Sequence, residues 1–233
     1  MNDAVKFDVL NPYPGLRPFR VEEKHLFFGR EEQVDRMLEK LEARRFLAVV
    51  GGSGSGKSSL VNCGLRPALH RGNMASAGSS WRMIQIRPGS DPFGAFAKAL
   101  AEPDLLFSGH TSSVVSLQEL VATTLRLGSL GLVDLIDQAD LHPDTKVLVI
   151  VDQFEELFRF RSLVFGERTD HFSPGEDAVA FVHLLLEAVM QTAVPIYIVI
   201  TMRSDFLGEC AQFCGLPEAI NDGQYLVPRL NRS

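Results

Sequence analysis

The chain has 233 residues, enough for one large or two small domains with a sizeable core. A hydrophobic content of 45% and a charged content of 22% indicate an ordinary soluble globular protein. The formal net charge of −6 argues against sequence-independent binding to nucleic acid. Residues 1–10 carry acids and no apolar core, which excludes a signal peptide, and no apolar run is long enough for a membrane span. Three cysteines without metal-ligand spacing favour a reducing compartment, so we expect a cytoplasmic protein with no membrane partner.

The N-terminal residues 1–28 are predicted to form an extended arm that lies on a core domain of residues 29–233. Residues 11–18 read NPYPGLRP, which is too rich in proline for a helix or a central strand. Next, Phe28 and Gly29 offer an apolar wall and a close backbone approach to a purine, or simply a helix-start turn with a buried aromatic ring. An amphipathic helix follows, and its apolar face carries Val34, Met37, Leu38 and Leu41.

The strongest motif lies at residues 51–59, which read GGSGSGKSS and fit the P-loop pattern G-x-x-x-x-G-K-[ST]. An apolar strand over residues 46–50 precedes it and a helical turn follows, as the motif requires. Backbone N–H groups freed by the glycines approach phosphate oxygens, Lys57 reaches the β- and γ-phosphates, and the Ser58 hydroxyl holds Mg²⁺. The alternative is a Gly/Ser-rich turn between strand and helix. The candidate nucleotide-binding residues here are Gly51, Gly52, Ser53, Gly54, Ser55, Gly56, Lys57, Ser58 and Ser59.

Strands and helices alternate along the rest of the chain. The helix after the P-loop is predicted to stop near Gly64 and Pro67. Further strands are predicted over residues 81–86, 147–151, 196–201 and 224–227. Helices are predicted over residues 93–100, 116–127, 130–139, 173–191 and 205–213, loops over 108–113 and 161–175, and a connector over 215–222. This alternation indicates a parallel sheet with right-handed crossovers.

Polar residues follow three of the predicted strands, at the sheet edge where open parallel sheets bind ligands. Asp152 after an apolar strand is the Walker B pattern, in which a carboxylate orients Mg²⁺; a strand-ending Asp is also common without that role. Glu155 and Glu156 lie within one turn of it, where either carboxylate can polarise an attacking water. The alternative for this pair is a charged helix start that the helix dipole favours.

Arg203 follows the fourth predicted strand at the same edge. Its guanidinium is a candidate to contact the γ-phosphate and so report whether that phosphate is present. The alternative is an ion pair with Asp205 or Glu209. We therefore take Lys57, Glu155, Glu156 and Arg203 as the candidate catalytic residues, and Ser58 and Asp152 as the candidate metal ligands.

Taken together, these motifs resemble the bacterial novel STAND NTPases, relatives of the NACHT and NB-ARC switch ATPases. The resemblance covers about residues 11–232. It is carried by PYPGLRPF (12–19), FFGRE (27–31), FLAVVGGSGSGKSSLV (46–61), VDQFEELF (151–158), TMRSDFL (201–207) and QYLVPRL (224–230). It implies a three-layer α/β sandwich of the P-loop NTPase type (ASCE or AAA+-like), with sheet order 5-1-4-3-2.

The resemblance also implies residue roles. Phe28, Gly29 and Arg30 would lie by the adenine with Leu226 and Pro228 nearby. Glu155 and Glu156 would take the acidic positions of the NACHT Walker B pattern, with Gln153 at its glycine position. Arg203 would be the sensor-one arginine. Members of the family continue into a helical lid, a winged helix and a C-terminal sensor region, so the chain is expected to be a fragment or a minimal core.

The expected function is an ATP-binding and ATP-hydrolysing switch, with ATP or ADP and Mg²⁺ as cofactors. Proteins that it resembles are monomers held by ADP; they exchange it for ATP, oligomerise and signal to attached effector domains, often in bacterial conflict or antiviral defence. We expect slow hydrolysis, because the lid and a neighbouring subunit ordinarily complete such sites. Two alternatives remain: a nucleotide-binding scaffold that does not hydrolyse, and a DNA-directed AAA+-like ATPase, against which the acidic charge weighs.

Overall fold

Five parallel strands form the central sheet of this computed structural model, which describes residue 15 and residues 17–102, 105–107, 114–158, 174–192 and 194–228. The strands are β1 (Phe46–Gly51), β2 (Trp81–Ile86), β3 (Lys146–Val151), β4 (Ile196–Arg203) and β5 (Gln224–Leu226). Their spatial order is β2-β3-β4-β1-β5. The predicted order 5-1-4-3-2 is the same order counted from the other edge, so it is confirmed.

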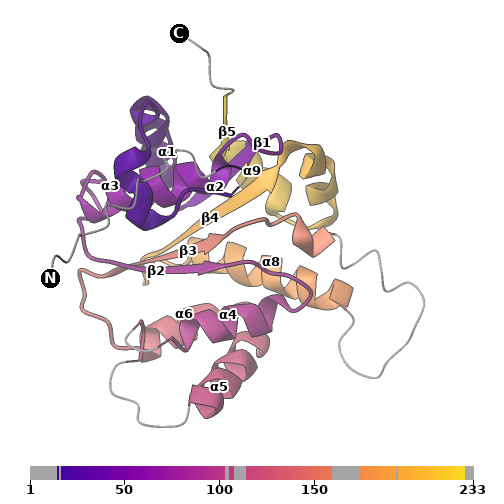
Figure 1. The fold of residues 1–233 in the computed structure, drawn as a ribbon. Helices are drawn as coiled ribbons and strands as arrows, with labels where there is room; N and C mark the ends of the chain where they lie inside the picture. Colours follow the sequence, from indigo (N-terminus) through magenta and orange to yellow (C-terminus); the bar gives the residue numbers. More distant parts are fainter. Residues whose placement is uncertain are drawn as a thin grey trace, which may run out of the picture.

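Helices cover both faces of the sheet (Figure 1). One face carries η1 (Val21–Leu26), α1 (Glu31–Arg44), α2 (Lys57–Ser59), η2 (Leu60–Leu65) and α3 (Arg66–His70). The other carries α4 (Pro92–Leu100), α5 (Val114–Arg126), α6 (Gly131–Gln138) and α8 (Pro174–Met190). The 3₁₀ helix η3 (Ser204–Gln212) and α9 (Leu216–Gly223) join β4 to β5. The predicted three-layer α/β sandwich is confirmed.

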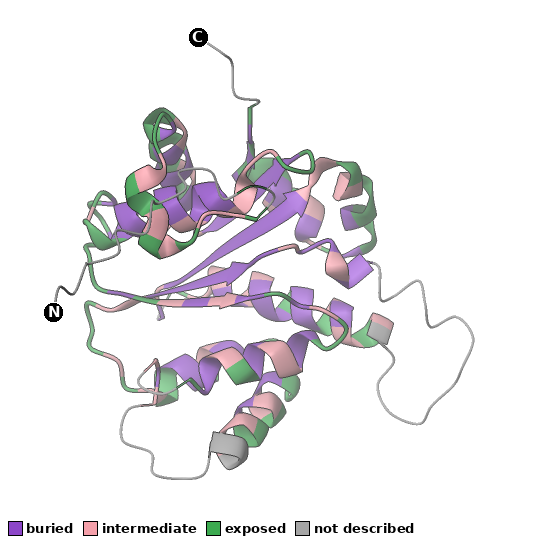
Figure 2. Ribbon diagram, in the orientation of Figure 1, coloured by how far each residue is buried: buried purple, intermediate pink, exposed green. Residues whose placement is uncertain are grey.

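Strands β1, β3 and β4 are buried almost throughout because each face packs against its own helical layer, whereas β2 and β5 are partly exposed (Figure 2). In β1, Leu47 and Val49 join a core cluster with the apolar face of α1, while Ala48 and Val50 join the cluster formed with α4, α6 and α8. This alternation follows from the two-residue repeat of a strand. It also explains why the strands read as continuous apolar runs in the sequence.

The strand register brings the ends of four strands to one edge. Gly51 at the end of β1 lies opposite Arg203 at the end of β4, and Ile86 at the end of β2 lies opposite Val151 at the end of β3. The P-loop follows Gly51 and Asp152 follows Val151 directly. The candidate residues therefore meet beyond the carboxyl ends of the strands, where ligands bind in open α/β sheets.

The helix after the P-loop is longer than predicted. It does not stop at Gly64 and Pro67 but continues through the π-helical turn η2 into α3. Pro67 lies at the start of α3, directly after the π-helical turn, so the change of helix type coincides with the missing proline N–H. The predicted start of α5 at Ser116 is also wrong by two residues, since the helix begins at Val114.

The predicted connector over residues 215–222 is wrong, because Leu216–Gly223 form α9. Gly215 at its N-cap has φ 80°, a left-handed conformation that glycine adopts readily, and Pro217 occupies the first turn. Leu216 and Ile220 are buried against the core. Gly and Pro therefore mark the start of a helix here rather than a break.

Some predictions fall on residues outside the described part of the chain: residues 1–14 and 16 of the arm predicted over residues 1–28, the loop over 108–113, and residues 161–173 of the loop over 161–175. In the described part of the arm, Val21–Leu26 form the 3₁₀ helix η1, so the prediction that the arm is extended is wrong there. Pro174 and Gly175, which the predicted loop and the predicted helix over residues 173–191 shared, begin α8. Within the described ranges, no helix is both long and apolar enough to cross a membrane.

Candidate nucleotide-binding site

The P-loop connects the buried end of β1 to the start of α2. Gly54 and Gly56 have φ 72° and 87°, a left-handed region that glycine enters at little cost. A Cβ atom placed on Gly52, Gly54 or Gly56 would meet no atom within 4 Å, so this loop borders open space. An open backbone loop leading into a helix N-terminus is suited to binding phosphate groups.

Lys57 folds back over this loop. Its Nζ donates to the backbone oxygens of Gly51 at 3.0 Å and Gly52 at 2.9 Å. Burial lowers the pKa of Lys57, while the carboxylate of Glu155 acts to raise it and the guanidinium of Arg203 to lower it further. The ammonium is therefore held at the mouth of the loop by weak neutral acceptors, which phosphate oxygens can replace.

Asp152 is the centre of the hydrogen-bond network at the strand ends. Its side chain is 2% exposed. Oδ1 accepts hydrogen bonds from the Ser58 hydroxyl at 2.6 Å and from the Thr201 hydroxyl at 2.7 Å. Oδ2 faces Arg87, whose Nε and Nη2 both lie 3.4 Å away. These contacts join residues from the P-loop helix, β4 and the end of β2 around one carboxylate.

Glu155 and Glu156 point to different surroundings. Glu155 is 6% exposed, and its Oε2 is buried without a hydrogen-bond partner among the residues that the structure describes. The Glu156 Oε2 instead accepts a hydrogen bond from the backbone N–H of Gly89 at 3.0 Å. A buried carboxylate oxygen without a partner is costly, so its retention points to a role in the chemistry of the site. The structure thus distinguishes between two residues that the sequence left equivalent.

Arg203 forms an ion pair with Asp205, the alternative to a phosphate contact that the sequence suggested. Its Nε donates to Asp205 Oδ1 at 3.1 Å and its Nη2 donates to Oδ2. The hydrogen bond to Asp205 raises the pKa of Arg203 above its ordinary value. The guanidinium also lies over the Phe206 ring, 5.7 Å from its centroid. Arg203 therefore lies at the predicted edge of the sheet, but its guanidinium is already paired with Asp205.

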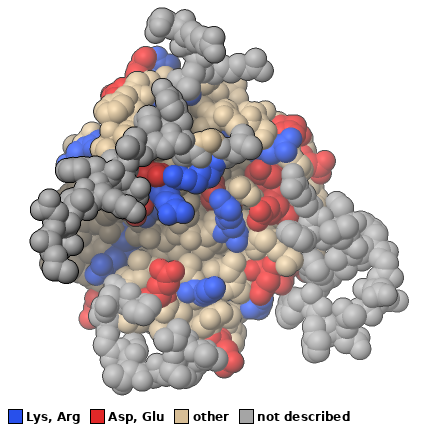
Figure 3. Space-filling view, viewed as in Figure 1, with Lys and Arg blue, Asp and Glu red and all other residues tan. Residues whose placement is uncertain are grey.

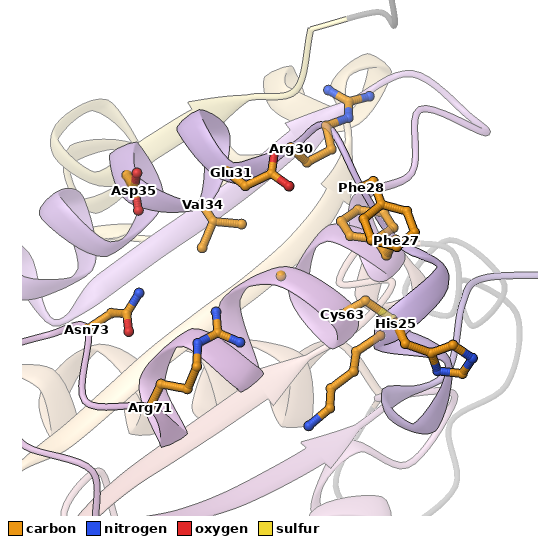
Figure 4. A pocket seen from close by; sticks show the side chains of 12 residues that line it. His25, Phe27, Phe28, Arg30, Glu31, Val34, Asp35, Cys63, Arg71 and Asn73 are labelled. Carbon is orange, nitrogen blue, oxygen red and sulfur yellow. The ribbon is translucent and has the colours of Figure 1, made fainter.

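The predicted adenine contacts lie beside η2 and β5. Phe28 and Arg30 line a pocket of about 440 Å³ that also contacts Gly64 in η2. Figure 4 shows these two side chains at one end of this pocket and Arg71 and Asn73 at the other. Arg30 is buried and its Nη1 donates to the backbone oxygen of Pro228 at 3.2 Å, which joins two of the predicted contacts. Leu226 is not among the residues that line this pocket, and it is 64% exposed.

The sequence missed Thr201 and Arg87. Arg87 follows β2 directly, as Asp152 follows β3, but an arginine at that place matches no motif. Thr201 lies inside β4, two residues before its end, where the strand-end pattern does not apply. Of the predicted P-loop residues, Ser53 is exposed, the Ser55 hydroxyl is buried without a hydrogen-bond partner, and Ser59 is buried. The Ser59 hydroxyl accepts a hydrogen bond from the Phe19 backbone at 3.1 Å, so it faces the arm. On the face shown in Figure 3, basic and acidic side chains lie interspersed.

A family comparison agrees with this geometry. The family described as Novel STAND NTPase 1 (nSTAND1) matches residues 12–233, nearly the whole chain. The chain therefore belongs to this family of STAND-type NTPases. The resemblance inferred from the motifs is confirmed. No curated protein sequence matches the chain significantly.

Solved structures with similar folds are distant in sequence. The E. coli MS115-1 HORMA:CdnC:Trip13 complex contains a chain with 13% identity and a TM-score of 0.48, covering 92% of this chain and 68% of that one. Aeropyrum pernix ORC2 (ADPNP-ADP complexes) shows 13% identity and a TM-score of 0.42, over 91% of this chain and 48% of that one. C. elegans PCH-2 shows 18% identity and a TM-score of 0.41, over 84% and 41%. The chain thus spans half or less of the ORC2 and PCH-2 chains.

Proposed function

We propose that this chain is the nucleotide-binding core of a Mg²⁺-dependent ATPase switch. The observation that carries this proposal is the 2.6 Å hydrogen bond between Ser58 and Asp152, which brings the P-loop hydroxyl and the Walker B carboxylate together. A glycine-rich turn without these oxygens at its end would not account for a buried carboxylate at this position. Family membership independently supports an NTPase.

The residues present fit a Mg²⁺ ion shared with nucleotide phosphates. Hydroxyl and carboxylate oxygens are the ligands that Mg²⁺ prefers, and Ser58 and Asp152 supply one of each. When bound, the ion would neutralise the charge that develops on the β- and γ-phosphates. Lys57 would exchange its two carbonyl partners for phosphate oxygens, and the N–H groups of Gly54 and Gly56 would add donors.

Glu155 is our candidate for the residue that orients the attacking water. Its buried Oε2 has no partner among the described residues, so it is the carboxylate oxygen with capacity to accept a hydrogen bond from a water at this edge. Glu156 is engaged with Gly89 and would position the turn after β2 rather than touch the water. Arg203 would contact the γ-phosphate only after leaving Asp205.

The purine end of the nucleotide would lie against residues 28–30. Phe28 is 74% exposed, which leaves its ring face available to a base, and Arg30 fixes the segment to Pro228. The wider role is also proposed: nucleotide-dependent oligomerisation and signalling to attached effector domains, in bacterial conflict or antiviral defence. This part rests on the kinship with STAND switch ATPases.

Two variants test the ATPase proposal together. Lys57→Ala should abolish ATP binding, measured by equilibrium binding of labelled ATP, because it removes the one P-loop cation. Glu155→Gln should bind ATP with wild-type affinity but hydrolyse it at least about a hundredfold more slowly. Full hydrolysis by both variants would contradict the site. Binding without turnover in the wild type, even at high protein concentration, would favour a non-hydrolysing scaffold.

A further inference from the structure

Arg87 occupies a position at the nucleotide site that the P-loop, Walker B and sensor motifs do not describe. It follows β2 directly, and the register places the end of β2 beside the end of β3, which leads into Asp152. The backbone N–H of Asp152 donates to the oxygen of Ile86 at 2.8 Å, which fixes the two strand ends together. The side chain of Arg87 therefore starts at the sheet edge where the candidate site lies.

The contact between Arg87 and Asp152 is loose on the arginine side. The Arg87 side chain is 54% exposed, whereas that of Asp152 is 2% exposed. Both nitrogens lie 3.4 Å from Oδ2, longer than the 2.7–2.9 Å or so of a strong charge-assisted hydrogen bond. The exposed guanidinium can return to water at small cost, and the buried Asp152 carboxylate keeps its two hydroxyl donors, Ser58 and Thr201, when Arg87 leaves.

The two oxygens of Asp152 are used differently. Oδ1 accepts from the hydroxyls of Ser58 and Thr201, whereas Arg87 is the only partner of Oδ2 among the described residues. Oδ2 is consequently the oxygen available to a metal-bound water. Oxygens of a terminal phosphate near this side would attract the guanidinium away from Oδ2.

The other arginine at this edge is held more tightly. Arg203 makes two hydrogen bonds to Asp205 and lies over the Phe206 ring. The Arg87 side chain is held less tightly, but the backbone that follows it is fixed. The N–H of Gly89 donates to Glu156, and Asp91 caps α4 by accepting a hydrogen bond from the N–H of Gly94 at 2.8 Å. Arg87 thus combines a fixed backbone with a side chain that is free to turn.

We infer that Arg87 is a γ-phosphate-contacting residue that leaves Asp152 when Mg·ATP binds and stays on Asp152 when Mg·ADP binds. The inference rests on the proposed ATPase function. The planar guanidinium fork matches two oxygens of a terminal phosphate, and a nucleoside diphosphate offers no group at that place. Arg87 would therefore distinguish tri- from diphosphate before Arg203 is released from Asp205.

The test compares two nucleotides on the full chain by isothermal titration calorimetry with Mg²⁺: ADP, and the β,γ-imido analogue of ATP. Arg87→Ala should weaken binding of the imido analogue about tenfold or more and leave ADP within about twofold, because one charge-assisted contact to phosphate is lost. Arg87→Lys should give an intermediate loss, since lysine keeps the charge but not the fork. The control is Arg82→Ala, which removes an exposed arginine within β2.

Three outcomes overturn the inference. Equal weakening of both nucleotides would mean that Arg87 only orients Asp152, and no weakening would mean that it does not approach the nucleotide. Wild-type protein that binds neither nucleotide would overturn the proposed function along with this inference. The fold of Arg87→Ala is checked without nucleotide by far-UV circular dichroism and by its melting temperature. If both are unchanged, misfolding is excluded as the cause of weaker binding. If Arg87→Ala does misfold, Arg87→Lys takes its place in the test.

Discussion

The hydroxyl of Ser58 and the carboxylate of Asp152 lie 94 positions apart in the sequence, yet they form a 2.6 Å hydrogen bond. Ser58 lies in the helix after β1 and Asp152 directly follows β3, and β4 runs between those two strands. The contact exists because the parallel strands all end at one edge and Asp152 reaches across β4 to the P-loop. Thr201 in β4 completes the bridge through its own hydroxyl.

Thr201→Val should destabilise the fold by about 1–3 kcal/mol. Thr201 is 1% exposed, and its hydroxyl donates to Asp152 while accepting from the N–H of Gln153 at 3.0 Å. Valine keeps the shape but leaves both partners short of a hydrogen bond. Urea unfolding measures the change as a lower midpoint with an unchanged slope.

The control for that substitution is Thr123→Val. Thr123 also makes a hydrogen bond, to the Glu119 backbone oxygen at 2.8 Å, but on the exposed surface of α5. We expect a change within about 0.5 kcal/mol there. An equal effect of the two substitutions would mean that the Thr201 network contributes no more than a surface hydroxyl.

ADP affinity should fall as the pH rises, starting below pH 10.5. Burial lowers the pKa of Lys57 from that ordinary value, and bound phosphates raise it again. Affinity is therefore constant below the pKa of the free protein and falls between the two values, where binding requires uptake of a proton. Dissociation constants measured from pH 7 to pH 10.5 test this. Lys57→Arg should show no such fall, and a constant wild-type affinity up to pH 10.5 would refute the assignment of Lys57.

Iodoacetamide at pH 8 should modify Cys214 long before the other two thiols. Cys214 is exposed, whereas burial raises the pKa of Cys63 and of Cys210 to about 11. Their thiolate fraction at pH 8 is then about a hundredfold below that of a thiol at the ordinary value of 9.0. The Cys63 thiol also donates to the Arg20 backbone oxygen at 2.9 Å, beneath the arm.

Mass spectrometry of labelled peptides measures these rates. Cys214→Ser should remove the fast phase and leave the slow ones unchanged. Rapid labelling of Cys63 in the intact protein would show that residues 17–26 do not stay on the P-loop helix.

Asp205→Ala should strengthen ATP binding about two- to tenfold. The substitution frees Arg203 to contact phosphate and removes a negative charge close enough to act on the pKa of Lys57. Competition against a labelled nucleotide measures the change. Asp222→Ala, which breaks the exposed 3.5 Å pair with Arg44, is the control and should leave affinity unchanged. Weaker ATP binding by Asp205→Ala would mean that Asp205 positions Arg203 productively.

The sequence predicted the sheet well because three of its strands, β1, β3 and β4, are nearly continuous apolar runs, and Asp152 directly follows one of them. It failed at α9, where a connector was predicted over residues 215–222 although Gly215 and Pro217 start a helix. The buried positions of Leu216 and Ile220 are set by packing with the core, which local pattern does not reveal. At Gln153 the structure instead explains a feature of the motif. Gln153 occupies the glycine position of the NACHT pattern, and its φ of 60° lies in the left-handed region that glycine adopts most readily.

The candidate site was predictable at the positions where a motif requires one particular residue type. Lys57, Ser58 and Asp152 were expected from spacing alone, and their placement at one edge follows from the parallel topology. The difference between Glu155 and Glu156 was not predictable, because it depends on which carboxylate the turn after β2 contacts. Arg87 escaped notice because an arginine after a strand has no motif; only its contact with Asp152 singles it out.

Thermal unfolding with and without nucleotide tests the central claim most directly. Mg·ATP or Mg·ADP at about 100 times its dissociation constant should stabilise the wild type by roughly 2.7 kcal/mol, and Lys57→Ala should remove that gain. Mg·GTP, run in parallel, reports whether the segment at Phe28 selects adenine. A stabilisation that survives in Lys57→Ala, or no stabilisation of the wild type by either adenine nucleotide, would contradict a nucleotide site at this P-loop.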